Sequence, residues 1–170
     1  IAYARPEFDE SDWQQYVHLN QRFADAVVEE AGDHRAVVFV QDYHFALLPR
    51  MVKEQRPDLT VCQFWHIPWP NREAFRVCPW GEEILHGLLG NDLLAFHIQY
   101  HCNNFLDTVD RMLVARVDYE HSTVWRGGRP TRYSSVAVSG WSIFSWKRPV
   151  ASLGSKARNS PGWPGIGSRS

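Results

Sequence analysis

Short apolar runs alternate with longer amphipathic segments along the chain. Three runs are rich in β-branched, aromatic and aliphatic side chains, as strands are. They are residues 36–41 (AVVFVQ), 59–65 (LTVCQFW) and 92–96 (DLLAF). Four segments repeat apolar side chains every three or four positions, which predicts helices. They are residues 11–30, 46–55, 79–89 and 99–112. The first run is almost wholly apolar, so we expect a strand covered on both faces.

The predicted helices and loops have recognisable ends. Ser11 is suited to capping the first helix, and Gly32 to ending it. Gly90 stands in the position expected of a stop after the helix that begins at Pro79. Two prolines in residues 66–70 (HIPWP) exclude a regular helix or a central strand there.

This alternation predicts an α/β fold with a parallel, doubly wound, Rossmann-like sheet and right-handed crossovers. Ligand sites of such sheets gather beyond the carboxyl ends of the strands. The first strand ends in residues 41–44 (QDYH) and the second in residues 66–70. We therefore expect Asp42 and His66 to lie at the same edge of one sheet.

Each candidate residue has a functional and a purely structural interpretation. The carboxylate of Asp42 could accept hydrogen bonds from sugar hydroxyls or act as a base, or it could cap the helix that follows. His66 could present its ring or carbonyl to a ligand, or it could be a buried, satisfied histidine. Trp65 and Trp69 could stack on a sugar face or belong to the core.

Several other chemistries find no support in the motifs. The sequence has no GxxxxGK[ST] or GxGxxG phosphate-binding loop, no GxSxG elbow and no CxxC pair. His97 and His101 are four residues apart, but the Glu of HExxH is missing and His97 falls at a strand end. We expect neither a metal site nor a cofactor.

The composition changes sharply near residue 132. All 19 Asp and Glu precede residue 121, whereas the last 38 residues hold five Lys and Arg, ten Ser and no acidic residue. Residues 126–129 (RGGR) predict a hairpin turn, and no period follows Arg132. We expect one partial domain over residues 1–132 and a tail without regular structure over residues 133–170. The tail is either a natural flexible segment or a shifted reading frame.

Charge and cysteine content bound the surroundings of the protein. A net charge of −1 argues against nucleic-acid binding through phosphate attraction. Three widely spaced cysteines indicate no disulfide framework, so we expect a cytoplasmic protein. No apolar run is long enough to span a membrane, and the first residues do not show a charged region followed by an apolar one. Because the first residue is Ile1, we expect the sequence to start inside a longer protein.

The motifs, taken in order, resemble those of one enzyme family. They are residues 41–49 (QDYHFALLP), residues 64–70 (FWHIPWP), residues 82–90 and 96–106, and the upstream pattern of Trp13, Tyr16, Asn20 and Phe23. This combination resembles the trehalose-6-phosphate synthases of glycosyltransferase family 20. The chain departs from the family pattern at three places. Many members have His at the position of Gln41, and Trp65 and Trp69 replace commoner residues. The sequence after Arg132 also differs. The last of these falls at the composition break and favours a shifted frame.

The resemblance implies part of the N-terminal, acceptor-side domain of a GT-B glycosyltransferase. Such an enzyme retains the anomeric configuration as it transfers glucose from UDP-glucose to glucose 6-phosphate in trehalose biosynthesis. By resemblance, Asp42 would bind the acceptor sugar and His66 would contact the donor glucose. The residues that grip the diphosphate would lie in a second domain, so we expect this fragment alone to be inactive. No nucleic acid or membrane partner is implied, and homo-oligomerisation stays open.

Two alternatives remain at the level of sequence. One is a related glucosyltransferase with another phosphorylated acceptor, such as glycerol 3-phosphate, or with an ADP or GDP donor. The other is a non-catalytic module that binds a sugar phosphate. The presence of both Asp42 and His66 favours descent from an active enzyme.

Overall fold

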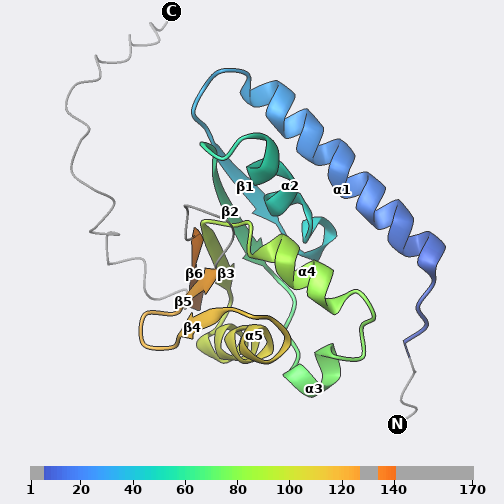
Figure 1. Cartoon of the computed structure of the whole chain (residues 1–170), viewed down its shortest axis with the longest axis vertical. Helices are drawn as coiled ribbons and strands as arrows, with labels where there is room; N and C mark the ends of the chain where they lie inside the picture. Colours follow the sequence, from blue (N-terminus) through green and yellow to red (C-terminus); the bar gives the residue numbers. More distant parts are fainter. Residues whose placement is uncertain (1–5, 127–133, 141–170) are drawn as a thin grey trace, which may run out of the picture.

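A computed structural model describes residues 6–126 and 134–140 of the chain (Figure 1). Its strands are β1 (Val37–Gln41), β2 (Thr60–Trp65), β3 (Leu93–Phe96), β4 (Arg116–Asp118), β5 (Thr123–Arg126) and β6 (Ser134–Gly140). The helices are α1 (Glu10–Ala31), the 3-10 turn η1 (Tyr43–Phe45), α2 (Leu48–Gln55), α3 (Arg72–Phe75), α4 (Gly81–Leu88) and α5 (Gln99–Met112). Within these ranges, no helix has the length and apolar character needed to cross a bilayer.

One six-stranded sheet has the order β1-β2-β3-β6-β5-β4. The pairs β1–β2, β2–β3 and β3–β6 are parallel, while β4–β5 and β5–β6 are antiparallel. The three runs that the apolar pattern marked as strands are therefore parallel neighbours. The predicted α/β class with a parallel sheet is confirmed.

The expectation that no regular structure follows Arg132 is wrong for residues 134–140. These residues form β6, which pairs with β3 on one side and with β5 on the other. A strand that is held by a partner strand on each side needs no apolar period of its own. The expected domain boundary at residue 132, most of the predicted turn and residues 141–170 lie outside the described residues.

The N-terminal cap of α1 and the burial of β1 differ from expectation. The carboxylate of Asp9, not Ser11, caps α1 by accepting the N–H groups of Ser11 and Asp12, whereas Gly32 ends the helix with φ 50° as expected. Strand β1 is not covered on both faces, because Phe39 is 65% exposed. β1 lies at the edge of the described sheet, and an apolar run does not reveal which elements cover it.

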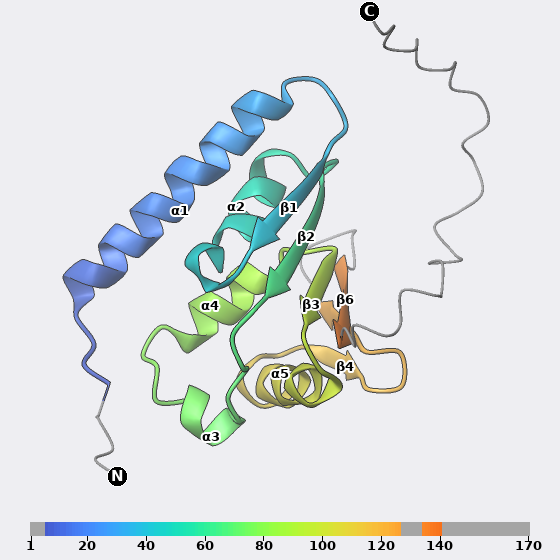
Figure 2. The same ribbon diagram turned by 180° about the vertical axis from the view of Figure 1, so that it is seen from behind.

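Two buried clusters hold the helices on the sheet. The first joins α1, β1, α2 and β2 around Ala24, Val52 and Val61, and α1 runs alongside α2 (Figures 1 and 2). The second joins α4, β3 and α5 around Leu85 and Phe105. Together they fix the sheet edge from which the loops after β1 and β2 emerge.

Helices α2 and α4 approach so closely that glycine is required on α4. A Cβ at Gly87 would lie 2.3 Å from the carbonyl oxygen of Ala46, and a Cβ at Gly90 would lie 2.3 Å from the backbone nitrogen of Arg50. The close contact, rather than a special backbone angle, explains both glycines.

Substitution Gly87→Ala should lower the free energy of unfolding by about 1–3 kcal/mol, because the added methyl group meets backbone atoms that can move only with α2. Urea denaturation followed by circular dichroism measures the change. Glu83→Ala, on the exposed side of the same helix, serves as the control and should change stability by less than about 0.5 kcal/mol. An equally stable Gly87→Ala protein would contradict the tight packing of α4 on α2.

Candidate functional site

The carboxyl ends of β1 and β2 bring Asp42 and His66 together. The register pairs Gln41 with Phe64, so Asp42 begins the loop after β1 beside the last residues of β2. Its N–H group donates to the carbonyl of Phe64 at 2.8 Å. Its Oδ1 accepts the backbone N–H of His66 at 3.1 Å. The predicted placement at one sheet edge is confirmed, whereas the roles of the two residues stay predictions.

Asp42 adopts a backbone conformation that side chains rarely accept. Its φ is 62° and its ψ is −173°, a region occupied almost only by glycine, at a cost of about 1–3 kcal/mol for other residues. The carboxylate makes no capping bond to η1, so the interpretation of Asp42 as a helix cap is wrong. It is turned instead towards the backbone of His66.

A buried pair of amides holds this strained backbone. Gln63 is 1% exposed, and its Nε2 donates to the carbonyl of Asp42 at 2.9 Å. Its Oε1 accepts from Nδ2 of Asn91, also buried, at 2.9 Å. Because an unpaired amide would be costly in this core, the pair fixes the position of the Asp42 carbonyl.

Tyr16 of α1 fixes the turn that follows Asp42. Its hydroxyl donates to the carbonyl of Tyr43 at 2.6 Å and accepts the N–H of Ala46 at 2.9 Å. Burial raises the pKa of the Tyr16 hydroxyl to about 12. The neutral hydroxyl is therefore the form that the fold requires, since only it can donate to a carbonyl.

Asn20, one helical turn further along α1, caps α2 from outside. It is fully buried, and its Oδ1 accepts the N–H groups of Leu47 at 3.1 Å and Leu48 at 3.0 Å. Its Nδ2 donates to the carbonyl of His44 at 3.1 Å. α2 has no cap of its own, so a residue from a distant helix satisfies its first N–H groups.

His66 is exposed, so its interpretation as a buried core histidine is wrong. Its Nε2 lies 2.7 Å from Oε1 of Gln41. Its ring lies against Phe64, with centroids 4.7 Å apart, and against His97, at 5.5 Å. Strand ends from β1, β2 and β3 therefore surround one imidazole.

Trp65 and Trp69 belong to the core, as the structural interpretation has it. They are 7% and 1% exposed and offer no open face to a sugar. Nε1 of Trp69 donates to the hydroxyl of Thr108 at 3.2 Å, and Nδ2 of Asn104 donates to the carbonyl of Trp69 at 3.2 Å. Trp69 thus anchors the loop that carries His66 on α5.

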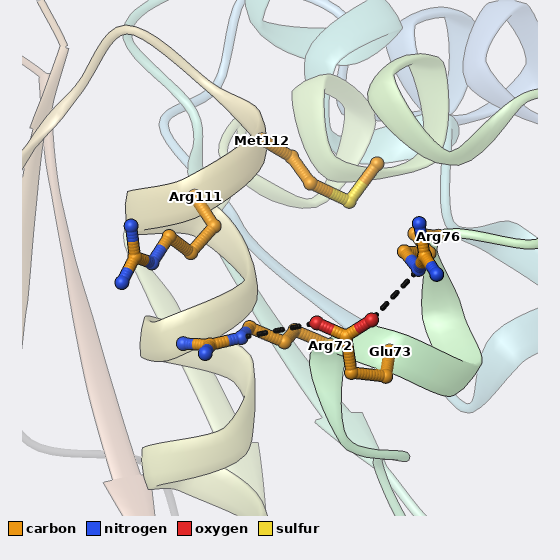
Figure 3. Close-up of a pocket in the computed structure, with 5 residues that line it drawn as sticks. All are labelled: Arg72, Glu73, Arg76, Arg111 and Met112. Carbon is orange, nitrogen blue, oxygen red and sulfur yellow. Dashed lines mark ion pairs between the residues drawn. The ribbon is translucent and has the colours of Figure 1, made fainter.

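A separate surface pocket of about 370 Å³ lies between α3 and the end of α5 (Figure 3). It is lined by Arg72, Glu73, Arg76, Arg111 and Met112. Glu73 forms ion pairs with Arg72 at 3.5 Å and Arg76 at 2.8 Å (Figure 3). Arg72 also reaches Asp107 of α5 at 2.9 Å, so these charges mainly tie the loop after β2 to α5.

The hydrogen bonds above leave one polar side-chain atom unused on each of Asp42 and His66. Within the described ranges, Oδ2 of Asp42 and Nδ1 of His66 have no hydrogen-bond partner. An acceptor-only carboxylate beside an imidazole nitrogen suits hydroxyl groups, which donate. The same part of the chain gathers no group of three or more His, Cys, Asp or Glu that could hold a metal.

The sequence patterns missed the supporting residues, namely Gln41, Gln63 and Asn91. Gln63 did leave a signal, because it is the one polar inward-facing residue of β2, whose pattern alternates. A buried amide in an otherwise apolar strand indicates a hydrogen-bonding task.

Comparisons with known proteins agree with the fold. The model of the family described as "Glycosyltransferase family 20" matches residues 2–140. A relative from Mycobacterium tuberculosis (strain CDC 1551 / Oshkosh), named "Trehalose-6-phosphate synthase", is 45% identical over 147 residues. That alignment covers 86% of this chain but 28% of the relative, so the chain spans less than a third of the relative's length.

Two solved structures share the fold at low identity. One is an α,α-trehalose-phosphate synthase (UDP-forming) from Burkholderia xenovorans in complex with glucose-6-phosphate, with a TM-score of 0.67 and 21% identity. The other is described as trehalose-6-phosphate from E. coli bound with UDP-2-fluoro glucose, with a TM-score of 0.68 and 22% identity. Each alignment covers 78% of this chain and 28% of the solved chain.

Substitution Asp42→Gly should give a more stable protein than Asp42→Ala, by about 1 kcal/mol. Both variants lose the bond to the His66 N–H group, but only glycine relieves the strain of φ 62°. Parallel urea titrations give the difference in the free energy of unfolding. An alanine variant as stable as the glycine variant would show that the backbone of Asp42 is not strained.

Stability should fall above pH 10 because of Tyr16. The folded state holds the hydroxyl proton up to about pH 12, whereas the unfolded chain releases it near 10.0. Below pH 10 the contribution is complete, and it is lost as the pH rises towards 12. Between these values the wild type should lose about 2 kcal/mol more than Tyr16→Phe. Identical pH profiles of the two proteins would refute the buried, neutral Tyr16.

Proposed function

The chain belongs to glycosyltransferase family 20, and on this premise we propose that it supplies the acceptor side of a retaining glucosyltransferase. The enzyme would transfer glucose from UDP-glucose to glucose 6-phosphate, giving trehalose 6-phosphate and UDP. The observation that carries the proposal is the pairing of the Asp42 carboxylate with His66 at the carboxyl edge of a parallel sheet. The names of the relative and of the solved structures support the choice of sugars.

Asp42 is the proposed contact for hydroxyl groups of glucose 6-phosphate. One of its oxygens is occupied by the His66 N–H group, which fixes the plane of the carboxylate. The other oxygen is free to accept from a sugar hydroxyl. Because Gln63 and Tyr16 fix the backbone on both sides of Asp42, the carboxylate is held in place before the sugar binds.

His66 is the proposed contact for the donor glucose. Its exposed ring lies within a shell of Gln41, Phe64 and His97. The loop behind it is pinned to α5 through Trp69. A rigid backbone and an outward ring suit a residue that positions the sugar rather than one that reacts.

The bond changes need little acid or base from these residues. The anomeric hydroxyl oxygen of glucose 6-phosphate forms a bond to C1 of the donor glucose as the bond from C1 to the diphosphate oxygen breaks. UDP leaves with the electron pair, and the hydroxyl proton passes to the departing phosphate oxygen. Basic groups elsewhere in the longer enzyme would stabilise the charge on that phosphate. We place the reaction in the cytoplasm, in keeping with three free cysteines.

Titration of the ¹⁵N-labelled 170-residue chain with glucose 6-phosphate should shift the amide signals of the loops after β1 and β2. Asp42→Ala should weaken this binding at least about tenfold, since a hydrogen bond to a carboxylate is lost. Glu30→Ala removes the same charge at the far end of α1 and should leave binding unchanged. If the Asp42→Ala variant bound glucose 6-phosphate as tightly as the wild type, Asp42 would not be an acceptor contact.

Two further measurements complete this test. Glycerol 3-phosphate should bind more weakly than glucose 6-phosphate. If it bound equally well or more tightly, the proposal of glucose 6-phosphate as the acceptor would be wrong. Mixed with both sugar substrates, the chain alone should release no UDP in a coupled assay. Turnover that depends on Asp42 would show that the 170 residues hold the complete catalytic site.

A further inference from the structure

The hydrogen bond between Gln41 and His66 has a chemical direction. The distance between Oε1 of Gln41 and Nε2 of His66 is 2.7 Å, within the range of a true hydrogen bond. An amide oxygen can only accept, so Nε2 must carry the hydrogen. In the neutral imidazole the other nitrogen, Nδ1, is then an acceptor.

We propose that Gln41 is a positioning residue that holds His66 as the Nε2–H tautomer and turns Nδ1 into an acceptor for a ligand hydroxyl. Gln41 is the last residue of β1, and His66 directly follows β2. The two strands are paired in parallel register, which places the amide beside the ring. A strand-borne partner is more rigid than a loop-borne one, so the tautomer is fixed by the sheet itself.

Within residues 6–126, no other group is bonded to Nε2 of His66. Phe64 and His97 meet the ring through aromatic contacts. Asp42 uses its Oδ1 for the backbone of His66, not for the ring. Among the residues with described positions, Gln41 is thus the group that selects the tautomer.

This arrangement gives the site a consistent polarity. Nδ1 of His66 and Oδ2 of Asp42 would both accept, so a ligand must offer two donors, as neighbouring sugar hydroxyls do. Which ligand offers these hydroxyl groups rests on the proposed function. The tautomer does not, since it is a property of the chain without ligand.

The test is nitrogen NMR of the 170-residue chain with ¹⁵N-labelled histidine, at about pH 8.5, where an ordinary imidazole is neutral. Two-bond couplings from the ring protons show which nitrogen carries the hydrogen. The His66→Asn variant, which lacks one set of signals, assigns the spectrum. We expect His66 to be the Nε2–H tautomer.

Two variants of Gln41 separate positioning from packing. Gln41→Leu removes the acceptor and should shift the tautomer ratio of His66 towards Nδ1–H about fivefold. Gln41→Glu keeps an acceptor and cannot donate, so it should retain the Nε2–H tautomer. Far-UV circular dichroism shows whether each variant is folded.

Three outcomes would overturn the proposal. They are an Nδ1–H tautomer in the wild-type chain, an unchanged ratio in folded Gln41→Leu, and loss of the Nε2–H tautomer in folded Gln41→Glu. An Nδ1–H tautomer in the wild type overturns the proposal even if Gln41→Leu fails to fold. Failure of glucose 6-phosphate to bind would leave this result intact, so the tautomer and the proposed function fail separately.

Discussion

The buried amide of Gln63 is the interaction on which the site depends. It sits in the middle of β2, inside the core, and its hydrogen bond to the Asp42 carbonyl holds a backbone with φ 62° and ψ −173°. Asn91 occupies the other end of the amide at 2.9 Å. Leaving one end of a core amide unpaired costs about 1–3 kcal/mol, so the Gln63 amide couples the positions of its two partners. Because the buried Gln63 amide must keep its partners, it fixes the position of the Asp42 carbonyl.

The rest of the fold brings the neighbours of Asp42 to this fixed point. Tyr16 and Asn20, on the same face of α1, bond to the turn that follows. Gly87 lets α4 press against the start of α2. Trp69 pins the loop of His66 to α5. Each contact spans elements distant in sequence, so the site is preorganised by tertiary structure rather than by local preferences, as binding sites for small polar ligands require.

The apolar pattern predicts what depends on local periodicity. It places three strands in order, gives α5 its observed bounds, and puts Asp42 and His66 at one edge because parallel strands end together. It does not predict features set by partners elsewhere: the exposed face of Phe39, the capping of α2 by Asn20, and β6, which forms between β3 and β5. Family motifs identify candidate residues, but they do not show that Gln63 and Gln41 support them.

Amide hydrogen exchange of His66 tests the central claim most directly. Its N–H group lies beyond the end of β2 and is bonded to the carboxylate of Asp42 at 3.1 Å. If Gln63 holds Asp42 in place, this amide should be protected in the wild type. In Gln63→Leu it should exchange at least about tenfold faster, while the amide of Cys62 in the same strand stays protected. Equal protection of His66 in both proteins would contradict the account.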